Sequence, residues 1–173
     1  MRALEIETPR LQLRPLTLDD ADDLHRIWTE PGVRKYLWDD ELISPELVES
    51  TIQRSIDSFK TNDYGLWAVR TADQETLMGF CGFWFFHEPP KLELLYGLSE
   101  ASWGQGLAAE AAIAMINFGF TELSFERIEA STDAGNAAST KVMQRAGMEF
   151  WKRENTNRLD TIYYAISRET FSK

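Results

Sequence analysis

The sequence predicts a mixed α/β (α+β) fold, with a twisted, mostly antiparallel sheet of about seven strands and helices on both faces. Three observations lead to this prediction. Short apolar or alternating runs recur along the chain, longer segments with a helical period separate several of them, and antiparallel pairs flank one alanine-rich helix. No repeat, low-complexity tract or linker divides the sequence, so we expect one domain over residues 1–173.

Composition and charge narrow the classes of function. A chain of 173 residues can bury about 70% of its unfolded surface without a disulfide or a metal. With one cysteine, Cys81, and two histidines, His25 and His87, we expect no metal site. The net charge of −10 disfavours nucleic acid and anionic membranes as partners, and it suits an amine-bearing substrate.

We expect a cytoplasmic protein. The segment Met1–Glu5 lacks the apolar region of a signal peptide. No run approaches the roughly 18 apolar residues that a membrane-spanning helix needs.

The first part of the chain predicts one strand and two helices. Arg10–Arg14 alternates apolar and polar residues, which is the pattern of a half-buried strand. A helix capped by Thr17 follows and stops at Pro31-Gly32. After a short helical turn and a loop, Ser44 caps a clearer helix that has Pro45 at its first position.

The middle of the chain predicts an antiparallel pair and then the segment around which we expect the site to form. Tyr64–Arg70 and Leu77–Phe86 are two strands joined by a polar turn. Lys91–Phe120 supplies an apolar strand, a loop with two glycines and a helix from about Gly106. Small residues along one side of this helix allow it to lie close to a sheet.

The last part predicts three strands and a short helix. Arg127–Thr132 has strand character, and the helix Ala137–Arg145 ends before Gly147, a residue type that favours helix C-termini. Met148–Glu154 and Thr161–Ser167 then form a closing hairpin.

The glycine loop is the first candidate site. Gly104 and Gly106 stand just before the alanine-rich helix. The first N–H groups of a helix lack intrahelical partners and the helix dipole adds partial positive charge, so this position can bind an anion. A phosphorylated ligand is one interpretation, and a glycine turn before an amphipathic helix is the other.

The same loop satisfies a dinucleotide-binding pattern, Gly104-x-Gly106-x-x-Ala109, with Glu129 near the position of a ribose-binding acid. That pattern places its first glycine directly after a parallel strand. Here Ser99–Trp103 intervenes and antiparallel pairs flank the segment. A dinucleotide-dependent oxidoreductase is therefore the weaker alternative.

Trp103–Ala111 resembles the acetyl-CoA pyrophosphate loop of the GNAT N-acetyltransferase superfamily, in the branch typified by the ribosomal-protein N-terminal acetyltransferases RimJ and RimL. The resemblance covers nearly all of the chain. Further segments similar to this branch are Thr8–Leu16, Asp20-Ala21, Gly65–Val69, Met78-Gly79, Asn136–Ser139 and Ala146–Met148. Trp103 stands where the wider superfamily usually has Arg or Gln, so we expect no side-chain contact with phosphate at this position.

The resemblance implies a GNAT fold, splayed near Leu98 and Thr132 to admit acetyl-CoA as co-substrate, without a metal. Backbone groups of the glycine loop would hold the pyrophosphate, and a strand edge would pair with the pantetheine amides. Gly97 fits an edge that a ligand approaches closely, and a packing glycine is the alternative. The implied cofactor-binding residues are Tyr96, Gly97, Leu98, Gly104, Gln105, Gly106, Leu107, Ala108, Ala109, Asn136 and Ser139.

Acetyl transfer requires a neutral amine, and a carboxylate facing the cleft can assist it directly or through ordered water. Glu93 is our candidate for this base, because it is a charge inside an otherwise apolar strand. The alternatives are that Glu93 lies on the solvent face of the strand or pairs with a nearby cation. His87 and Glu88, at the end of the previous strand, are weaker candidates for the same role.

The departing thiolate needs only a hydrogen bond or modest protonation, so a hydroxyl suffices. By resemblance, Ser139 lies near the thiol and Asn136 touches the pantetheine arm. Both residues also suit a structural role, since Asn136 can cap the helix that follows and Ser139 can be its third residue. Tyr36 and Trp38, in a loop, are expected to line the amine pocket.

We therefore predict an N-acetyltransferase that moves an acetyl group from acetyl-CoA to a primary amine by direct transfer in a ternary complex. The expected acceptor is a protein N-terminal amine or a small amine, and the protein is expected to be a monomer or a homodimer. A catalytically silent acyl-CoA-binding module with the same fold is a further alternative.

Overall fold

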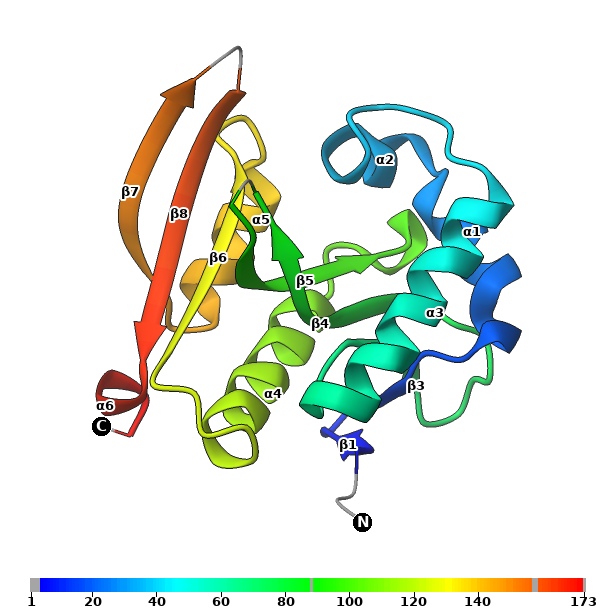
Figure 1. Ribbon diagram of the computed structural model, residues 1–173, viewed down its shortest axis with the longest axis horizontal. Helices are drawn as coiled ribbons and strands as arrows, with labels where there is room; N and C mark the ends of the chain where they lie inside the picture. Colours follow the sequence, from blue (N-terminus) through cyan, green and yellow to red (C-terminus); the bar gives the residue numbers. More distant parts are fainter. Residues whose placement is uncertain (1–3, 88, 157–158, 173) are drawn as a thin grey trace.

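The computed structural model describes residues 4–87, 89–156 and 159–172, which form eight strands and six α-helices (Figure 1). The strands make two antiparallel sheets, one in the order β1-β2-β3-β4-β5 and one in the order β6-β8-β7. The strands are β1 (Ile6–Glu7), β2 (Leu11–Pro15), β3 (Leu66–Thr71), β4 (Gly79–Phe86), β5 (Lys91–Leu98), β6 (Arg127–Asp133), β7 (Glu149–Thr156) and β8 (Leu159–Ser167). The helices are α1 (Ala21–Trp28), α2 (Pro31–Leu37), α3 (Pro45–Asn62), α4 (Leu107–Thr121), α5 (Ala137–Arg145) and α6 (Arg168–Phe171). The predicted mixed α/β fold is confirmed.

The strand arrangement adds two details to the prediction. The two-residue strand β1 pairs with β2, with Ile6 opposite Leu13, and it is too short to show an alternating pattern in the sequence. The expected splay is a complete break in the hydrogen bonding, because β5 and β6 are neighbours in space but belong to separate sheets. The three-stranded sheet stands beside the five-stranded sheet at the left of Figure 1.

Helices cover both faces of the five-stranded sheet, because its strands send apolar side chains into two separate cores. One core lies under α4 and includes Leu13, Trp67 and Phe83. The other lies under α1 and α3 and includes Trp28 and Phe80. All five side chains are at most 2% exposed, so the sheet is a rigid platform for anything that is built on its edge.

Local signals set the ends of the helices. The Ser44 hydroxyl accepts a hydrogen bond from the Leu47 N–H at 3.2 Å, and Pro45 occupies the first position of α3, as predicted. α1 ends at Trp28, before the proline that was expected to stop it. Pro31 also begins a new helix, α2, since a proline suits the first helical turn. None of the helices in the described ranges is long and apolar enough to cross a membrane.

β7 and β8 form the predicted closing hairpin. A bulge between Phe150 and Lys152 shifts the register of their pairing. β7 is the outer strand of the three-stranded sheet, and its Phe150 and Trp151 side chains are exposed. β6, the strand that faces β5, is therefore held in place by β8.

Candidate active site

The glycine loop joins β5 to α4 and adopts a conformation that its two glycines permit. A 3₁₀ turn, Glu100–Ser102, follows β5, and α4 begins at Leu107. Gly104 and Gly106 both have a φ of +75°, in the left-handed region that disfavours a side chain. A Cβ added at Gly104 would meet nothing within 4 Å, so the loop is open there. Gly106 is the N-cap of α4, and the first N–H groups of this helix are available to an anion.

The other predicted loop residues offer backbone rather than side-chain groups. Leu107 and Ala109 are 5% and 7% exposed, and their side chains belong to the core or its margin. Ala108 packs against the core under α4. They lie in the first turn of α4, and the binding of a ligand through the N–H groups of this segment stays a prediction.

Arg10 places a guanidinium group beside this loop. Its Nε donates to Glu110 Oε2 at 2.6 Å, and its Nη1 donates to the Gln105 carbonyl oxygen at 2.8 Å. Its Nη2 lies 3.6 Å from the position that a Cβ on Gly106 would take. Burial on its own would raise the pKa of Glu110. Hydrogen bonds from Thr8 and Arg10 outweigh this effect and hold the pKa below its usual value, so Glu110 is ionised at neutral pH. No local sequence pattern links these distant partners, and the sequence did not predict Arg10 as a site residue.

Two glutamates tie the glycine loop to the N-terminal helices. Glu30, just before α2, accepts hydrogen bonds from the Ser99 hydroxyl at 2.8 Å and from the Glu100 N–H at 2.7 Å. Glu100 in turn accepts a hydrogen bond from the N–H of Gly32 in the first turn of α2. Each carboxylate satisfies an N–H group at the start of the other residue's short helix. The loop and α2 thus hold each other in place.

Trp103 makes a contact within the protein. Its Nε1 donates to the Leu98 carbonyl oxygen at 2.8 Å. Its ring lies against Gly32, where an added Cβ would come within 2.5 Å of the ring. Leu98 was predicted to belong to the strand edge that pairs with the pantetheine amides, and its carbonyl oxygen retains one lone pair for such a contact.

Tyr96 and Ser139 meet between β5 and α5, and they form a hydroxyl pair. The Tyr96 hydroxyl lies 2.9 Å from Ser139 Oγ and donates to the Ser139 carbonyl oxygen at 2.9 Å. Burial raises the pKa of Tyr96 well above its usual value, so this hydroxyl keeps its proton. The Asn136 side chain accepts a hydrogen bond from the Ser139 N–H at 3.2 Å, which is the helix cap considered as an alternative role. The contact of both residues with a ligand stays a prediction.

Glu93 lies at the break between the two sheets. Its side chain is 2% exposed, so the expectation that it could lie on a solvent face is wrong. Its Oε1 accepts a hydrogen bond from the Ser131 hydroxyl of β6 at 2.5 Å, and its Oε2 lies 2.9 Å from His87 Nε2. The other alternative was that Glu93 pairs with a nearby cation, and His87 is such a cation when its imidazole is protonated. Glu88, the other weaker candidate, lies outside the described residues.

The Tyr96–Ser139 pair and Glu93 lie on opposite faces of β5. Side chains alternate along a strand, and the pairing of β4 with β5 is regular from Gly79–Leu98 to Phe86–Lys91. Tyr96 therefore shares a face with the core under α4, whereas Glu93 shares the other face with Leu95 and the core under α1 and α3.

Gly97 is explained by packing on the Glu93 face. A Cβ added at Gly97 would lie 2.8 Å from the Phe80 ring, and the ring occupies the space that a side chain would need. The packing interpretation of this glycine is thus supported. A role of its backbone at the strand edge stays a prediction.

Tyr36 lies in α2 and not in the predicted loop, and it bridges from this helix to the turn after β6. Its hydroxyl donates to the Gly135 carbonyl oxygen at 3.2 Å. Close by, burial and the negative charge of Asp39 raise the pKa of Asp133 above its usual value. The helix that carries Tyr36 thus reaches the loop that leads to Asn136 and α5.

Trp38 belongs largely to the core under α1. Its ring centroid lies 5.2 Å from that of Trp28, and it packs as a partly buried member of that cluster. Its Nε1 is buried and has no hydrogen-bond partner among the described residues. A contact of Trp38 with an acceptor stays a prediction, as it does for Tyr36.

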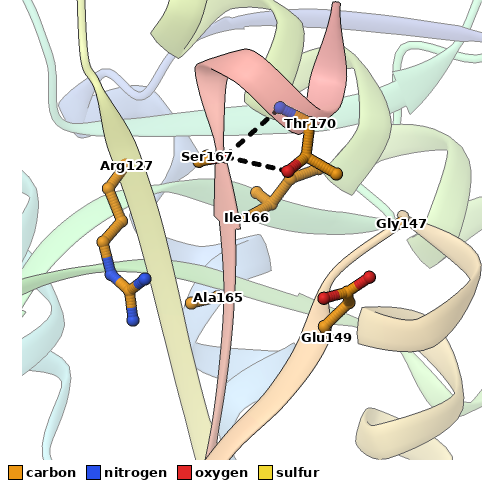
Figure 2. A pocket seen from close by; sticks show the side chains of 7 residues that line it. All are labelled: Arg127, Gly147, Glu149, Ala165, Ile166, Ser167 and Thr170. Atoms are coloured by element: carbon orange, nitrogen blue, oxygen red, sulfur yellow. Dashed lines mark hydrogen bonds between the residues drawn. The ribbon is translucent and has the colours of Figure 1, made fainter. Parts of the chain in front are cut away.

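Two small hollows lie elsewhere. The larger has a volume of about 110 Å³ and is lined by Arg127, Gly147, Glu149, Ala165, Ile166, Ser167 and Thr170 (Figure 2). Figure 2 shows Arg127 and Glu149 on the strands either side of β8, and Ser167 bonded to Thr170 at the start of α6. The second, of about 90 Å³, lies between Leu92 and Leu94 of β5 and Ile128 of β6. Ligand pockets are usually about 300–1,000 Å³, so neither hollow holds a cofactor-sized molecule.

Comparisons with known proteins agree on one family. The family model described as "Acetyltransferase (GNAT) domain" matches residues 10–149. The uncharacterized N-acetyltransferase p20 of Bacillus licheniformis is 32% identical over 137 residues, covering 79% of this chain and 77% of that protein. The uncharacterized N-acetyltransferase YnaD of Bacillus subtilis is 26% identical, with 98% of this chain and 100% of that protein covered.

Solved structures share the fold at lower identity. A GNAT-family acetyltransferase from Bacillus anthracis superposes with a TM-score of 0.80 at 23% identity, covering 95% of this chain and 99% of that one. RimL, a ribosomal L7/L12 alpha-N-protein acetyltransferase in complex with coenzyme A, superposes with a TM-score of 0.80 at 19% identity, covering 96% and 99%. Together with the family match over most of the chain, these findings establish that this protein belongs to the GNAT acetyltransferase family.

Proposed function

We propose that this protein transfers an acetyl group from acetyl-CoA to a primary amine by direct transfer in a ternary complex. The observation that supports this most strongly is the pair of polar groups on opposite faces of β5. The Tyr96–Ser139 hydroxyl pair lies on one face, and Glu93 with His87 lies on the other, at the break between the sheets. Direct transfer needs one group for the leaving thiolate and another for the attacking amine.

The glycine loop fits the phosphates of acetyl-CoA. Gly104 and Gly106 leave the backbone bare, and a side chain at either position would be strained at a φ of +75°. The start of α4 adds N–H donors and the positive end of a helix dipole. Arg10 adds a guanidinium group in a chain whose net charge of −10 otherwise repels phosphate.

The hydroxyl pair suits the leaving group. A thiolate whose conjugate acid has a pKa near 8.5 needs only a hydrogen bond or modest protonation to depart. Burial keeps the Tyr96 hydroxyl protonated, so it acts as a donor and not as a base. Ser139, 2.9 Å from that hydroxyl, can donate a hydrogen bond to the sulfur.

The Glu93 face suits the amine. At pH 7 an α-amine with a pKa near 7.8 costs only about 1 kcal/mol to deprotonate, whereas a lysine amine near 10.4 costs about 4.6 kcal/mol. A group that accepts the amine proton lowers the barrier for either class. The buried Glu93, bonded to Ser131 and His87, belongs to the basic pair Glu93–His87 on this face.

A protein N-terminal amine is the acceptor we favour, and a small amine is the alternative. The CoA-bound neighbour is named as an acetyltransferase of a ribosomal protein's α-amine, and another neighbour is described as modifying the N-terminal serine of ribosomal protein L7/L12. These neighbours share the fold with this chain at 19% identity, which is the extent of their support. The acidic pair Asp39 and Asp133, near Tyr36, would attract a cationic amine of either kind.

Two measurements test the function. In calorimetry, we expect the protein to bind acetyl-CoA and not NAD, and binding of NAD alone would support an oxidoreductase instead. In a thiol-release assay with a panel of N-terminal peptides and small amines, we expect turnover with at least one primary amine. Binding of acetyl-CoA without turnover across the panel would indicate a catalytically silent binding module.

A further inference from the structure

Glu93 is poorly placed to touch a substrate itself. A group that takes a proton must come within hydrogen-bond reach of it, directly or through one water. Glu93 is 2% exposed, and each of its two oxygens already has a partner, the Ser131 hydroxyl and the His87 imidazole.

His87 is the accessible member of this group. Its side chain is 29% exposed, and it stands directly after β4 at a φ of +71°. Its ring lies beside that of Tyr163, with centroids 5.5 Å apart. The turn therefore carries the imidazole from the end of one sheet across the break to the other.

The two ring nitrogens of His87 have different environments. Nε2 faces both Glu93 Oε2 at 2.9 Å and Ser131 Oγ at 3.3 Å. A carboxylate at this distance favours the tautomer in which Nε2 carries the proton and donates it. The other nitrogen, Nδ1, then has a lone pair that can accept a proton.

We propose that His87 accepts the amine proton through Nδ1, and that Glu93 is a positioning residue that fixes the tautomer and stabilises the resulting imidazolium. This proposal rests on the proposed function and deepens it. In the step, the amine nitrogen bonds to the acetyl carbon and the carbon–sulfur bond breaks. The amine proton moves to Nδ1, and the thiolate leaves with a hydrogen bond from the Tyr96–Ser139 pair and is later protonated by solvent. A second proton on His87 is lost to solvent before the next turnover.

The surrounding charges suit this role. The titratable groups that face the imidazole are Glu93 from β5 and Tyr163 from β8, with Glu154 and Lys152 of β7 beyond the tyrosine ring. Burial, together with the charges of Glu154 and Glu93, raises the pKa of Tyr163 to about 12. Tyr163 therefore stays neutral at pH 7 and does not compete for the proton.

A glutamine variant separates catalysis from structure. His87→Gln keeps a side-chain N–H that can donate to Glu93 but cannot accept a proton at neutral pH. We expect its kcat to fall about 100-fold at pH 7, with the Kd for acetyl-CoA unchanged by calorimetry. The matched control is His25→Gln, because His25 is the other histidine and its Nε2 contacts the Ile43 carbonyl near α1. This control should keep the wild-type kcat.

A glycine variant tests the chemistry directly. His87→Gly suits the positive φ of this position and leaves a space for free imidazole. We expect added imidazole to raise the kcat of His87→Gly at least tenfold and to leave the kcat of His87→Gln unchanged. A glutamine variant with wild-type kcat, or a folded glycine variant that imidazole does not rescue, would overturn the proposal. If the wild-type protein itself shows no turnover, the proposed function has failed instead.

Discussion

The two faces of β5 carry opposite kinds of polar group, although they belong to one strand of eight residues. On the α4 face, Tyr96 and Ser139 are neutral hydroxyls, and burial keeps the tyrosine proton in place. On the other face, Glu93 and His87 form a pair that can hold a charge. The difference teaches that the strand separates a proton donor from a proton acceptor by its alternation alone.

The break between the sheets lies beside both faces of β5. β5 has β4 as its hydrogen-bonded neighbour, and the strand beyond it, β6, is paired to β8 instead. Ser131 of β6 reaches back to Glu93 and spans the break on the charged face. Ser139 of α5 reaches Tyr96 on the neutral face. Each face of the strand is thus completed by a residue from beyond the break.

The largest expected effect lies on the charged face. We expect Glu93→Gln to lower kcat about 100-fold at pH 7, because it removes the carboxylate that orients His87. The Kd for acetyl-CoA should stay unchanged in calorimetry. Because Glu93 acts through His87, the double variant with His87→Gln should be no slower than His87→Gln alone. Multiplication of the two losses would show that the residues act independently.

A smaller effect is expected on the neutral face. Tyr96→Phe removes one hydroxyl from the pair, and loss of one hydrogen bond of about 1.4 kcal/mol in the transition state lowers kcat about tenfold. Steady-state kinetics with acetyl-CoA should show this loss, and Tyr164→Phe on β8 is the matched control. A loss larger than that of Glu93→Gln would mean that the hydroxyl pair, and not the charged pair, dominates the barrier.

The fold and the glycine loop were predictable from the sequence for physical reasons. Strand alternation and helix caps are local patterns. Ser44, Pro45 and the glycines of the loop each determine the backbone conformation at their own position. The exception was Pro31, which begins α2 as well as following α1, because a proline at a first helical turn and a proline after a helix give similar local signals.

The partnerships within the site were not predictable in the same way. Glu93 was identified as a charge inside an apolar strand, but its burial and its contacts with His87 and Ser131 depend on the turn after β4 and on the break beside β6. The sequence assigned Tyr96 only a backbone role, whereas the fold brings its hydroxyl to Ser139. Contacts between distant segments arise from packing, which single-sequence patterns do not encode.

Two glycines, one in the loop before α4 and one in β5, separate ligand binding from packing. Gly106→Ala strains a residue at a φ of +75° in the loop before α4, so we expect the Kd for acetyl-CoA to rise about fivefold. Gly97→Ala on the Glu93 face pushes against Phe80, so we expect a loss of about 1–3 kcal/mol in the free energy of unfolding. Calorimetry and urea unfolding of both variants distinguish the two effects. A large affinity loss in a stably folded Gly97→Ala would instead support a ligand contact at that edge.

Arg10 carries the smallest expected effect and the one most sensitive to salt. Its guanidinium is half exposed beside the loop, so its attraction to phosphate is screened by ions. We expect Arg10→Gln to raise the Kd for acetyl-CoA about threefold at low salt, with the difference disappearing near 0.5 M NaCl. The matched control is Glu110→Gln, which removes the negative partner while keeping Arg10. If Arg10 acts on phosphate, the control should bind acetyl-CoA at least as tightly as the wild type. If Arg10 only anchors the N-terminal segment to α4, both variants should weaken binding equally at every salt concentration.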